Sequence, residues 1–402
     1  MTHRIVILGA GYAGVTAANR LAGRLDPAGY HLTLVNGDER FVERVRLHQV
    51  AVGQDIPRLL IRDMVPETAV EFRPGFVTEL DVERQRVTVE KDGQPEDIDY
   101  DTLIYALGST ADGPEVVPGQ SHTFTINHHA GAVELSSFLD SLDSGEHATV
   151  VGAGMTGIEM ATELAESRPD LRTRLIDRGE FAPEYPAKGR NHLLRVFDRL
   201  NIDLVDHTAV AEVTKESVLT DAGHDLASAA TIWTSGFSVH PLAAATPLTT
   251  TSVGRIVVDG QMRSVSHPNV FAIGDAASAD GPGRQSEARM ACGTATPMAM
   301  IGASSLVKEL TGQRQWAPPI KLYARCISLG RSDGLFQTST FDDVPKRMAI
   351  TGRFAARQKE LICKGALWNV QRSGFLTYRR TPSAAKGGRR TRLARRANAA
   401  ER

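Results

Sequence analysis

The stretch Ile5-Val6-Ile7-Leu8-Gly9-Ala10-Gly11-Tyr12-Ala13-Gly14 returns 143 residues later as Ala148-Thr149-Val150-Val151-Gly152-Ala153-Gly154-Met155-Thr156-Gly157. Each copy places an apolar strand before a G-x-G-x-x-G turn and a helix after it, and a second strand follows about 20 residues on, at 31–35 and 173–176. One glycine-rich turn alone occurs in many proteins without a ligand. Two copies in the same phase predict two dinucleotide-binding units in one chain.

Glycine is needed at each of the three positions for a different reason. The first makes the tight turn, the second lets the backbone approach a pyrophosphate, and the third lets helix and strand pack closely. The N-terminus of the following helix then offers free N–H groups and partial positive charge to the phosphates. The residues predicted to contact the two dinucleotides are Gly9, Gly11, Tyr12, Ala13 and Gly14 in the first copy, and Gly152, Gly154, Thr156, Gly157 and Glu159 in the second.

The residues that end the second strands bear on which dinucleotide binds. Asp177 can accept hydrogen bonds from the ribose hydroxyls of NAD, whereas the adjacent Arg178 could meet the 2′-phosphate of NADP. We therefore expect NADH and leave NADPH open. The first copy carries Asn36 where an acid is usual, so a ribose contact there is weaker or shifts to Asp38.

The composition bounds the remaining possibilities. At 402 residues the chain fits two or three domains, and it lacks the run of roughly 18 apolar residues that a membrane-spanning helix needs. Its three cysteines form no close pair, which predicts neither a disulfide framework nor a metal motif and favours a reducing cytoplasm. Residues 379–402 hold nine Lys/Arg against one Glu, and we expect a disordered basic tail at 381–402 without a specific nucleic-acid partner.

A later stretch carries a family resemblance. Ser266-His267-Pro268-Asn269-Val270-Phe271-Ala272-Ile273-Gly274-Asp275 resembles the second FAD fingerprint of the pyridine nucleotide-disulfide oxidoreductase family. In that family the aspartate, here Asp275, binds the ribityl chain of the flavin. Segments 100–108 and 231–236, which end at Gly108 and Gly236, resemble its short hinge motifs. The resemblance spans roughly residues 4–310 and implies FAD in the first unit and a nicotinamide dinucleotide in the second.

The expected fold is therefore α/β, with two three-layer Rossmann-type domains, the second inserted in the first, and a small C-terminal α+β unit. We assign 1–115 and 255–316 to the FAD domain and 116–254 to the NAD(P) domain. The C-terminal unit follows at 317–380, where the sequence predicts short strands and then one or two helices.

The branch of the family is a separate question. Disulfide reductases of the family carry a C-x4-C pair that has no counterpart in residues 37–65, so dithiol relay there is ruled out. The layout is most similar to type II NADH dehydrogenases, which pass electrons from NADH through FAD to a quinone. Their glutamine-rich stretch is absent from 289–297. The electron acceptor thus stays open between a quinone and another small molecule. Three alternative functions also remain: a flavoenzyme acting on a small metabolite, a ferredoxin-type reductase, and a non-enzymatic flavoprotein resembling apoptosis-inducing factor.

Three residues are candidates for a catalytic role. The segment 41–51 occupies the place of the missing cysteines, and if it is helical, Phe41, Val45 and His48 share one face while Arg44 lies off it. It is either a packed helix or a segment in which Arg44 or His48 touches flavin or substrate. Glu159, two residues beyond the second motif, either suits a helix N-terminus or, by the resemblance, lies near the nicotinamide and flavin.

An apolar row marks the C-terminal unit. Phe354, Leu361, Trp368 and Phe375 recur every seven residues among basic side chains that include Lys359. The row either packs on the body or on a second subunit, or it rests on an anionic membrane, as the C-terminus of type II dehydrogenases does. We therefore expect a cytoplasmic protein with either peripheral contact at the inner face of the membrane or a homodimer through this unit.

Overall fold

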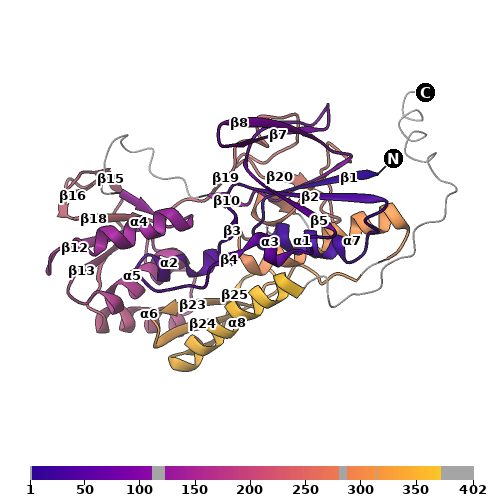
Figure 1. Cartoon of the computed structure of the whole chain (residues 1–402). Helices are drawn as coiled ribbons and strands as arrows, with labels where there is room; N and C mark the ends of the chain where they lie inside the picture. Colours follow the sequence, from indigo (N-terminus) through magenta and orange to yellow (C-terminus); the bar gives the residue numbers. More distant parts are fainter. Residues whose placement is uncertain (1, 111–122, 280–287, 315, 373–402) are drawn as a thin grey trace.

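The first sheet is the core of one Rossmann-type unit. The computed structural model describes residues 2–110, 123–279, 288–314 and 316–372. Five parallel strands follow the order β21-β9-β1-β2-β5, and their apolar runs are buried because helices or another sheet cover both faces. Helices α1 and α7 pack on one face, and an antiparallel sheet of β6, β7 and β8 lies on the other (Figure 1). The bounds are β1 His3–Leu8, α1 Tyr12–Ala22, β2 Tyr30–Asn36, β5 Val70–Pro74, β6 Phe76–Asp81, β7 Arg86–Lys91, β8 Gln94–Asp99, β9 Thr102–Tyr105, β21 Val270–Ala272 and α7 Cys292–Thr311.

The second sheet has the same architecture and forms the core of a second Rossmann-type unit. Its five parallel strands follow the order β11-β18-β12-β13-β14, and all of them come between β9 and β21 of the first sheet. The second unit is thus inserted in the first, as the α/β prediction has it. The bounds are β11 Thr123–Thr125, α4 His129–Leu139, β12 His147–Val151, α5 Met155–Ser167, β13 Arg172–Ile176, α6 Ala187–Arg199, β14 Asp203–Val205, β18 Ala230–Trp233 and an antiparallel sheet of β15 Val210–Val213, β16 Ser217–Thr220 and β17 Asp225–Ala227.

The chain crosses between the two sheets at neighbouring places. Strand β10 (Ser109–Thr110) leaves the first unit and pairs antiparallel with β19 (Ser238–Val239), which returns to it. After the return, β20 (Ile256–Val258) and β22 (Ala277–Ala279) form a parallel pair around the 3-10 turn η2 (Gly274–Ala276). This Gly-Asp turn lies close to the first crossing, because the Ser109 hydroxyl of β10 hydrogen-bonds the Asp275 carboxylate.

The segment from residue 40 to 64 departs from the expected helix. Arg40–Phe41 is a short strand, β3, paired with β4 (Leu59–Leu60), and η1 (Arg44–Arg46) is a 3-10 turn. Only α2 (Leu47–Val50) and α3 (Ile61–Met64) are α-helical. The predicted common face of Phe41, Val45 and His48 does not form, because Phe41 is held in a strand and packs edge-on against Tyr12. Helix α2 instead contacts α4 and α5 and joins the core of the second unit.

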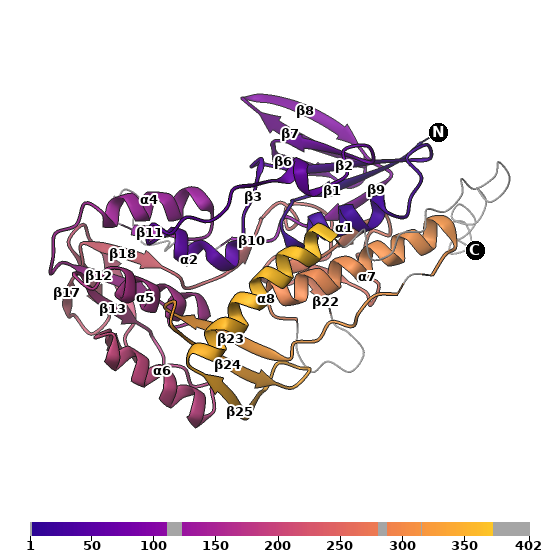
Figure 2. The same cartoon turned by 60° about the horizontal axis from the view of Figure 1, so that its bottom comes forward.

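The C-terminal unit folds back over both sheets. Strands β23 (Ala324–Leu329), β24 (Asp333–Ser339) and β25 (Pro345–Thr351) form an antiparallel sheet, and α8 (Arg353–Arg372) is one continuous helix across Gly365. Helix α8 packs against α1 and β24 (Figure 2). No helix in the described part of the chain is long and apolar enough to cross a membrane.

The apolar row of α8 does not pack on the body. Phe354, Leu361 and Trp368 are 61%, 67% and 47% exposed, whereas Ala355, Cys363 and Val370 form the buried side of the helix. Packing of the row on the body of the chain, one of the expected arrangements, is therefore wrong. Phe375 and the basic tail lie outside the described residues.

Candidate functional site

The two glycine motifs adopt the same backbone. Gly9 has φ +95° and Gly152 has φ +104°, in the left-handed region that favours glycine. A side chain at Gly14 would place its Cβ 1.8 Å from the carbonyl oxygen of Gly9, and the same distance separates a Cβ at Gly157 from the oxygen of Gly152. Turn and helix therefore pack against each other in a way that only glycine allows.

The middle glycine of each motif faces open space. A Cβ built at Gly11 or at Gly154 would meet no atom within 4 Å. These positions lie directly before the first turns of α1 and α5, whose N–H groups have no partners inside the helix. Each glycine turn and the helix N-terminus after it form a cradle, the first at Gly9–Gly14 and the second at Gly152–Gly157. The two cradles accordingly fit an anionic group such as a diphosphate.

A chain of polar contacts joins the Gly-Asp turn to Arg44 at the first cradle. The Ser109 hydroxyl donates to Asp275 Oδ2 at 2.7 Å, and Arg44 Nη1 donates to the Ser109 carbonyl oxygen at 2.7 Å. Burial lowers the pKa of the Arg44 guanidinium, and the charge of Asp275 opposes that shift. Gly108 lies beside Arg44 Nη1, and a Cβ at Gly274 would be 3.0 Å from that of Ala13. The candidates Arg44, Gly108, Gly274 and Asp275 thus gather around the first motif.

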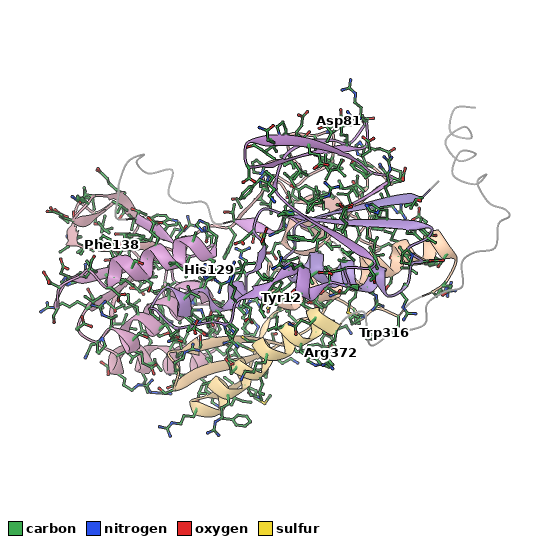
Figure 3. The ribbon with its side chains drawn as sticks, viewed as in Figure 1. Tyr12, Asp81, His129, Phe138, Trp316 and Arg372 are labelled. Atoms are coloured by element: carbon green, nitrogen blue, oxygen red, sulfur yellow. The ribbon has the colours of Figure 1, made fainter. Side chains whose placement is uncertain are left out.

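Two further side chains complete this region. Tyr12, near the centre of the molecule (Figure 3), stacks edge-on against Phe41, and its buried hydroxyl has no hydrogen-bond partner among the described residues. Arg255, which sequence reasoning missed, lies beneath the Gly-Asp turn and donates to the carbonyl oxygens of Asp275 and Ala277. Its position directly before the short apolar strand β20 was a weak signal.

The second cradle is closed by the end of β13 and the turn after β18. The Asp177 carboxylate accepts the N–H of Ala153 at 2.6 Å and the N–H of Gly179 at 2.9 Å. The Thr234 hydroxyl donates to the carbonyl oxygens of Val151 and Gly152. Gly236 has φ +79° at the turn, and Thr156 lies in the first turn of α5. Asp177 keeps unused lone pairs for a ribose hydroxyl.

Glu159 forms a buried ion pair with a lysine of the C-terminal helix. Lys359 of α8 donates its ammonium to Glu159 Oε1 at 2.9 Å and to the Cys326 carbonyl oxygen at 3.1 Å. Burial alone would raise the pKa of the Glu159 carboxyl, but Lys359, His48 and the Ser328 N–H together lower it. The carboxylate in turn raises the pKa of Lys359 against its burial. The sequence places Lys359 among the basic side chains of this helix and carries no sign that it pairs with Glu159.

His48 contacts a different set of groups from Arg44, so the structure does not bring these two candidates into one cluster. Its Nε2 is 3.2 Å from the Ser328 hydroxyl, and its Nδ1 is 4.0 Å from Glu159 Oε2. Complete burial lowers the pKa of the imidazole to about 4, with the nearby cations Lys359, Arg331 and Arg46 adding to the effect of burial. His48 therefore belongs with Glu159, Ser328 and Lys359, a group that we call the Glu159 side of the site.

The three cysteines lie near Lys359 but remain thiols. Burial raises the pKa of Cys326 and of Cys363 to about 11 and also raises that of Cys292. Protonated thiols are poor nucleophiles, so we assign none of the three a chemical role.

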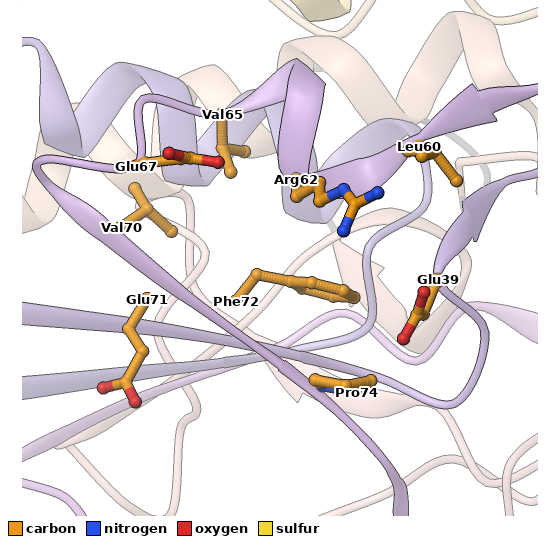
Figure 4. A pocket seen from close by; sticks show the side chains of 9 residues that line it. All are labelled: Glu39, Leu60, Arg62, Val65, Glu67, Val70, Glu71, Phe72 and Pro74. Carbon is orange, nitrogen blue, oxygen red and sulfur yellow. The ribbon is translucent and has the colours of Figure 1, made fainter.

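A separate cavity of about 360 Å³ lies between α3 and β5 (Figure 4). Phe72 forms its floor and Arg62 and Glu67 point into it from α3 and the turn that follows. It is lined by none of the candidate site residues.

Comparison with known proteins adds to this geometry. A model of the pyridine nucleotide-disulphide oxidoreductase family matches residues 3–299. An NADH dehydrogenase-like protein of Mycobacterium tuberculosis is 27% identical over 353 residues, which cover 83% of this chain and 87% of that protein. A type II NADH:quinone oxidoreductase of Staphylococcus aureus is 21% identical over 397 residues, which cover 91% of this chain and 96% of that protein.

Among solved structures, the sulfide:quinone oxidoreductase of Aquifex aeolicus superposes with a TM-score of 0.77 at 17% identity, covering 92% of each chain. At this level of identity the superposition establishes a shared fold.

Proposed function

The chain belongs to the pyridine nucleotide-disulphide oxidoreductase family, and from that premise we propose that it is an FAD-dependent NADH oxidoreductase that passes electrons to a quinone. The observation that carries the proposal is the pair of matching glycine cradles, of which one has a Gly-Asp turn beside it and the other an aspartate at the end of its second strand. Two dinucleotides in one chain suit the transfer of electrons from one to the other.

The first cradle suits FAD. Gly11 leaves room for a diphosphate before α1, and Asp275, held by the Ser109 hydroxyl, offers a carboxylate to the hydroxyls of a ribityl chain. Arg44 places a buried guanidinium next to this carboxylate. A flavin held by these residues would supply hydride acceptance from the nicotinamide and two-electron transfer to the acceptor.

The second cradle suits NADH better than NADPH. The Asp177 carboxylate, held by the Ala153 and Gly179 N–H groups, offers an acceptor to a ribose hydroxyl and would repel a 2′-phosphate. Arg178 is exposed beside it, where its guanidinium would meet the 2′-phosphate of NADPH and not NADH.

The acceptor side suits a compound that takes up protons with its electrons. The Glu159 carboxylate holds the Lys359 ammonium in a buried position, next to Cys292 at the start of α7. An ammonium fixed there can donate a proton to a carbonyl oxygen that becomes a hydroxyl. A quinone has two such oxygens, and quinone reduction is the activity named for the Staphylococcus aureus relative.

The proposal is tested with the purified full-length protein. We expect bound flavin in the absorption spectrum, rapid bleaching on mixing with NADH, and recovery of the oxidised spectrum on adding a soluble menaquinone or ubiquinone analogue. The variant Glu159→Gln should bleach with NADH but recover slowly with quinone, while Arg178→Ala should behave as wild type with NADH and quinone. Recovery with ferredoxin or oxygen but not with either quinone would refute the acceptor, and failure to bleach would refute the donor.

A further inference from the structure

Quinone reduction by NADH requires a proton from solution. The hydride brings two electrons and one hydrogen, and the overall change is NADH + H⁺ + quinone to NAD⁺ + quinol. One proton must therefore reach the acceptor side for every turnover. Lys359, the donor we assign there, is only 16% exposed and would have to be reprotonated after each donation.

The inner half of a path to Lys359 consists of three hydrogen-bonded groups. Glu159 Oε1 accepts from Lys359 Nζ at 2.9 Å and lies 3.2 Å from the Ser328 hydroxyl. The same hydroxyl is 3.2 Å from Nε2 of His48. Because a hydroxyl both donates and accepts, Ser328 can receive a proton from the imidazole while giving its own to the carboxylate.

The outer half begins one helical turn from Glu159. Glu163 is fully buried on the same face of α5, and its Oε2 lies 3.8 Å from His48 Nε2. Burial raises the pKa of the Glu163 carboxyl against the opposing effect of Arg331. Arg331 donates to Glu163 Oε2 at 2.6 Å, and its side chain is 38% exposed. Glu163 thus lies directly beneath a group that water reaches.

We propose that Glu163, His48 and Ser328 form a proton relay that resupplies Glu159 and Lys359 from the surface at Arg331. A proton enters at Glu163, passes through His48 Nε2 and the Ser328 hydroxyl to Glu159 Oε1, and reprotonates Lys359 Nζ. Each group that passes a proton receives one in return, so the relay ends each turnover as it began. The inference rests on the proposed function, since it gives a role to the proton that quinone reduction consumes.

The charges around His48 favour movement in this direction. It is faced by Glu159 and Glu163 from α5, Lys359 from α8, Arg331 from the turn after β23 and Arg46 from its own segment. The positive charge of Lys359 lowers the pKa of the imidazole. Once Lys359 has given up its proton that effect vanishes, and His48 becomes a better proton acceptor at the moment when a proton is needed.

The test compares two acceptors after one reduction by NADH. Ser328→Ala removes the hydroxyl but keeps the backbone N–H that binds Glu159, and we expect it to slow reoxidation by ubiquinone-1 by about 100-fold, with a changed solvent deuterium effect. Reoxidation by ferricyanide, which takes electrons without protons, should remain at the wild-type rate. Ser339→Ala is the matched control, because this buried hydroxyl of β24 has no hydrogen-bond partner in the described part of the chain.

Two results would overturn the relay. If Ser328→Ala and His48→Gln are reoxidised by ubiquinone-1 at the wild-type rate, no proton passes through them. If Ser328→Ala is slow with ferricyanide as well, the hydroxyl has a structural role only.

A second measurement does not depend on turnover. Titration of His48 by NMR in the wild type and in Lys359→Met should show its midpoint rising by about one pH unit or more in the variant. If wild-type enzyme does not react with quinone, the proposed acceptor fails and this titration judges the relay alone. An unchanged midpoint would refute it.

Discussion

Asn36 and Asp177 make the same hydrogen bond in the two halves of the chain. Asn36 Oδ1 accepts the N–H of Ala10 at 2.9 Å, and Asp177 Oδ2 accepts the N–H of Ala153 at 2.6 Å. Each thereby ties the end of a second strand to the residue between the first two glycines. The structural role is shared, and the two cradles differ at this position only in charge.

Removing that charge should change the preference for nucleotide. Asp177→Asn keeps an oxygen for the Ala153 N–H but no longer repels a 2′-phosphate. We expect the ratio of kcat/KM for NADPH over NADH to rise by about tenfold, equivalent to about 1.4 kcal/mol. The reverse change Asn36→Asp in the first cradle should leave the ratio unaltered, and equal shifts in both variants would contradict the assignment.

The open space at the middle glycines gives a matched pair of variants. A Cβ at Gly154 meets no protein atom, so Gly154→Ala should fold with the wild-type Tm yet bind NADH more weakly. Gly11→Ala should instead lower the FAD content of the purified protein and spare NADH binding, as measured by absorbance and by calorimetry. If Gly154→Ala lost FAD, or Gly11→Ala lost NADH binding, the assignment of the two dinucleotides to the two cradles would have to be reversed.

The repeat predicts both sheets because glycine turns, apolar strands and helix phase are local properties of the chain. The Glu159 side of the site could not be predicted in the same way. Lys359 and Ser328 lie about 170 to 200 residues beyond Glu159, and only the fold of the C-terminal unit brings them to it. The helical spacing around Arg44 predicts the wrong element for a related reason, since Arg40–Phe41 pairs with a strand further along the chain.

Burial of His48 should make the protein sensitive to acid. The pKa of its imidazole is lowered from 6.5 to about 4, so between these values the unfolded chain binds a proton that the folded chain does not. Stability is therefore lost as the pH falls through this window, by about 3 kcal/mol in total. Urea unfolding at pH 7 and pH 4.5 should show a smaller loss for His48→Gln than for wild type. Parallel losses in the two proteins would mean that other groups dominate.

Arg44 should matter for holding FAD. Its guanidinium binds Ser109, which in turn binds Asp275, so Arg44→Ala leaves the Gly-Asp turn without this support. We expect a lower ratio of flavin to protein after purification and a flavin Kd raised by about tenfold. Arg44→Lys should restore only part of the affinity, because an ammonium cannot reproduce the fork of the guanidinium. Full flavin content in Arg44→Ala would place this residue outside the cofactor site.

The role of the exposed apolar row on α8 should be tested by substitution, because truncation would also disturb the Glu159 ion pair. Deleting residues 351–402 would abolish vesicle binding and also remove Lys359 from Glu159, so any loss of activity would have two causes. Changing Phe354, Leu361 and Trp368 together to serine alters only the exposed side of the helix, since these residues are 61%, 67% and 47% exposed. We expect this variant to release from vesicles of anionic phospholipid while it keeps the wild-type rate of NADH oxidation by ferricyanide. If it still binds vesicles but changes from dimer to monomer in light scattering, the row contacts a second copy of the chain and the membrane prediction is wrong.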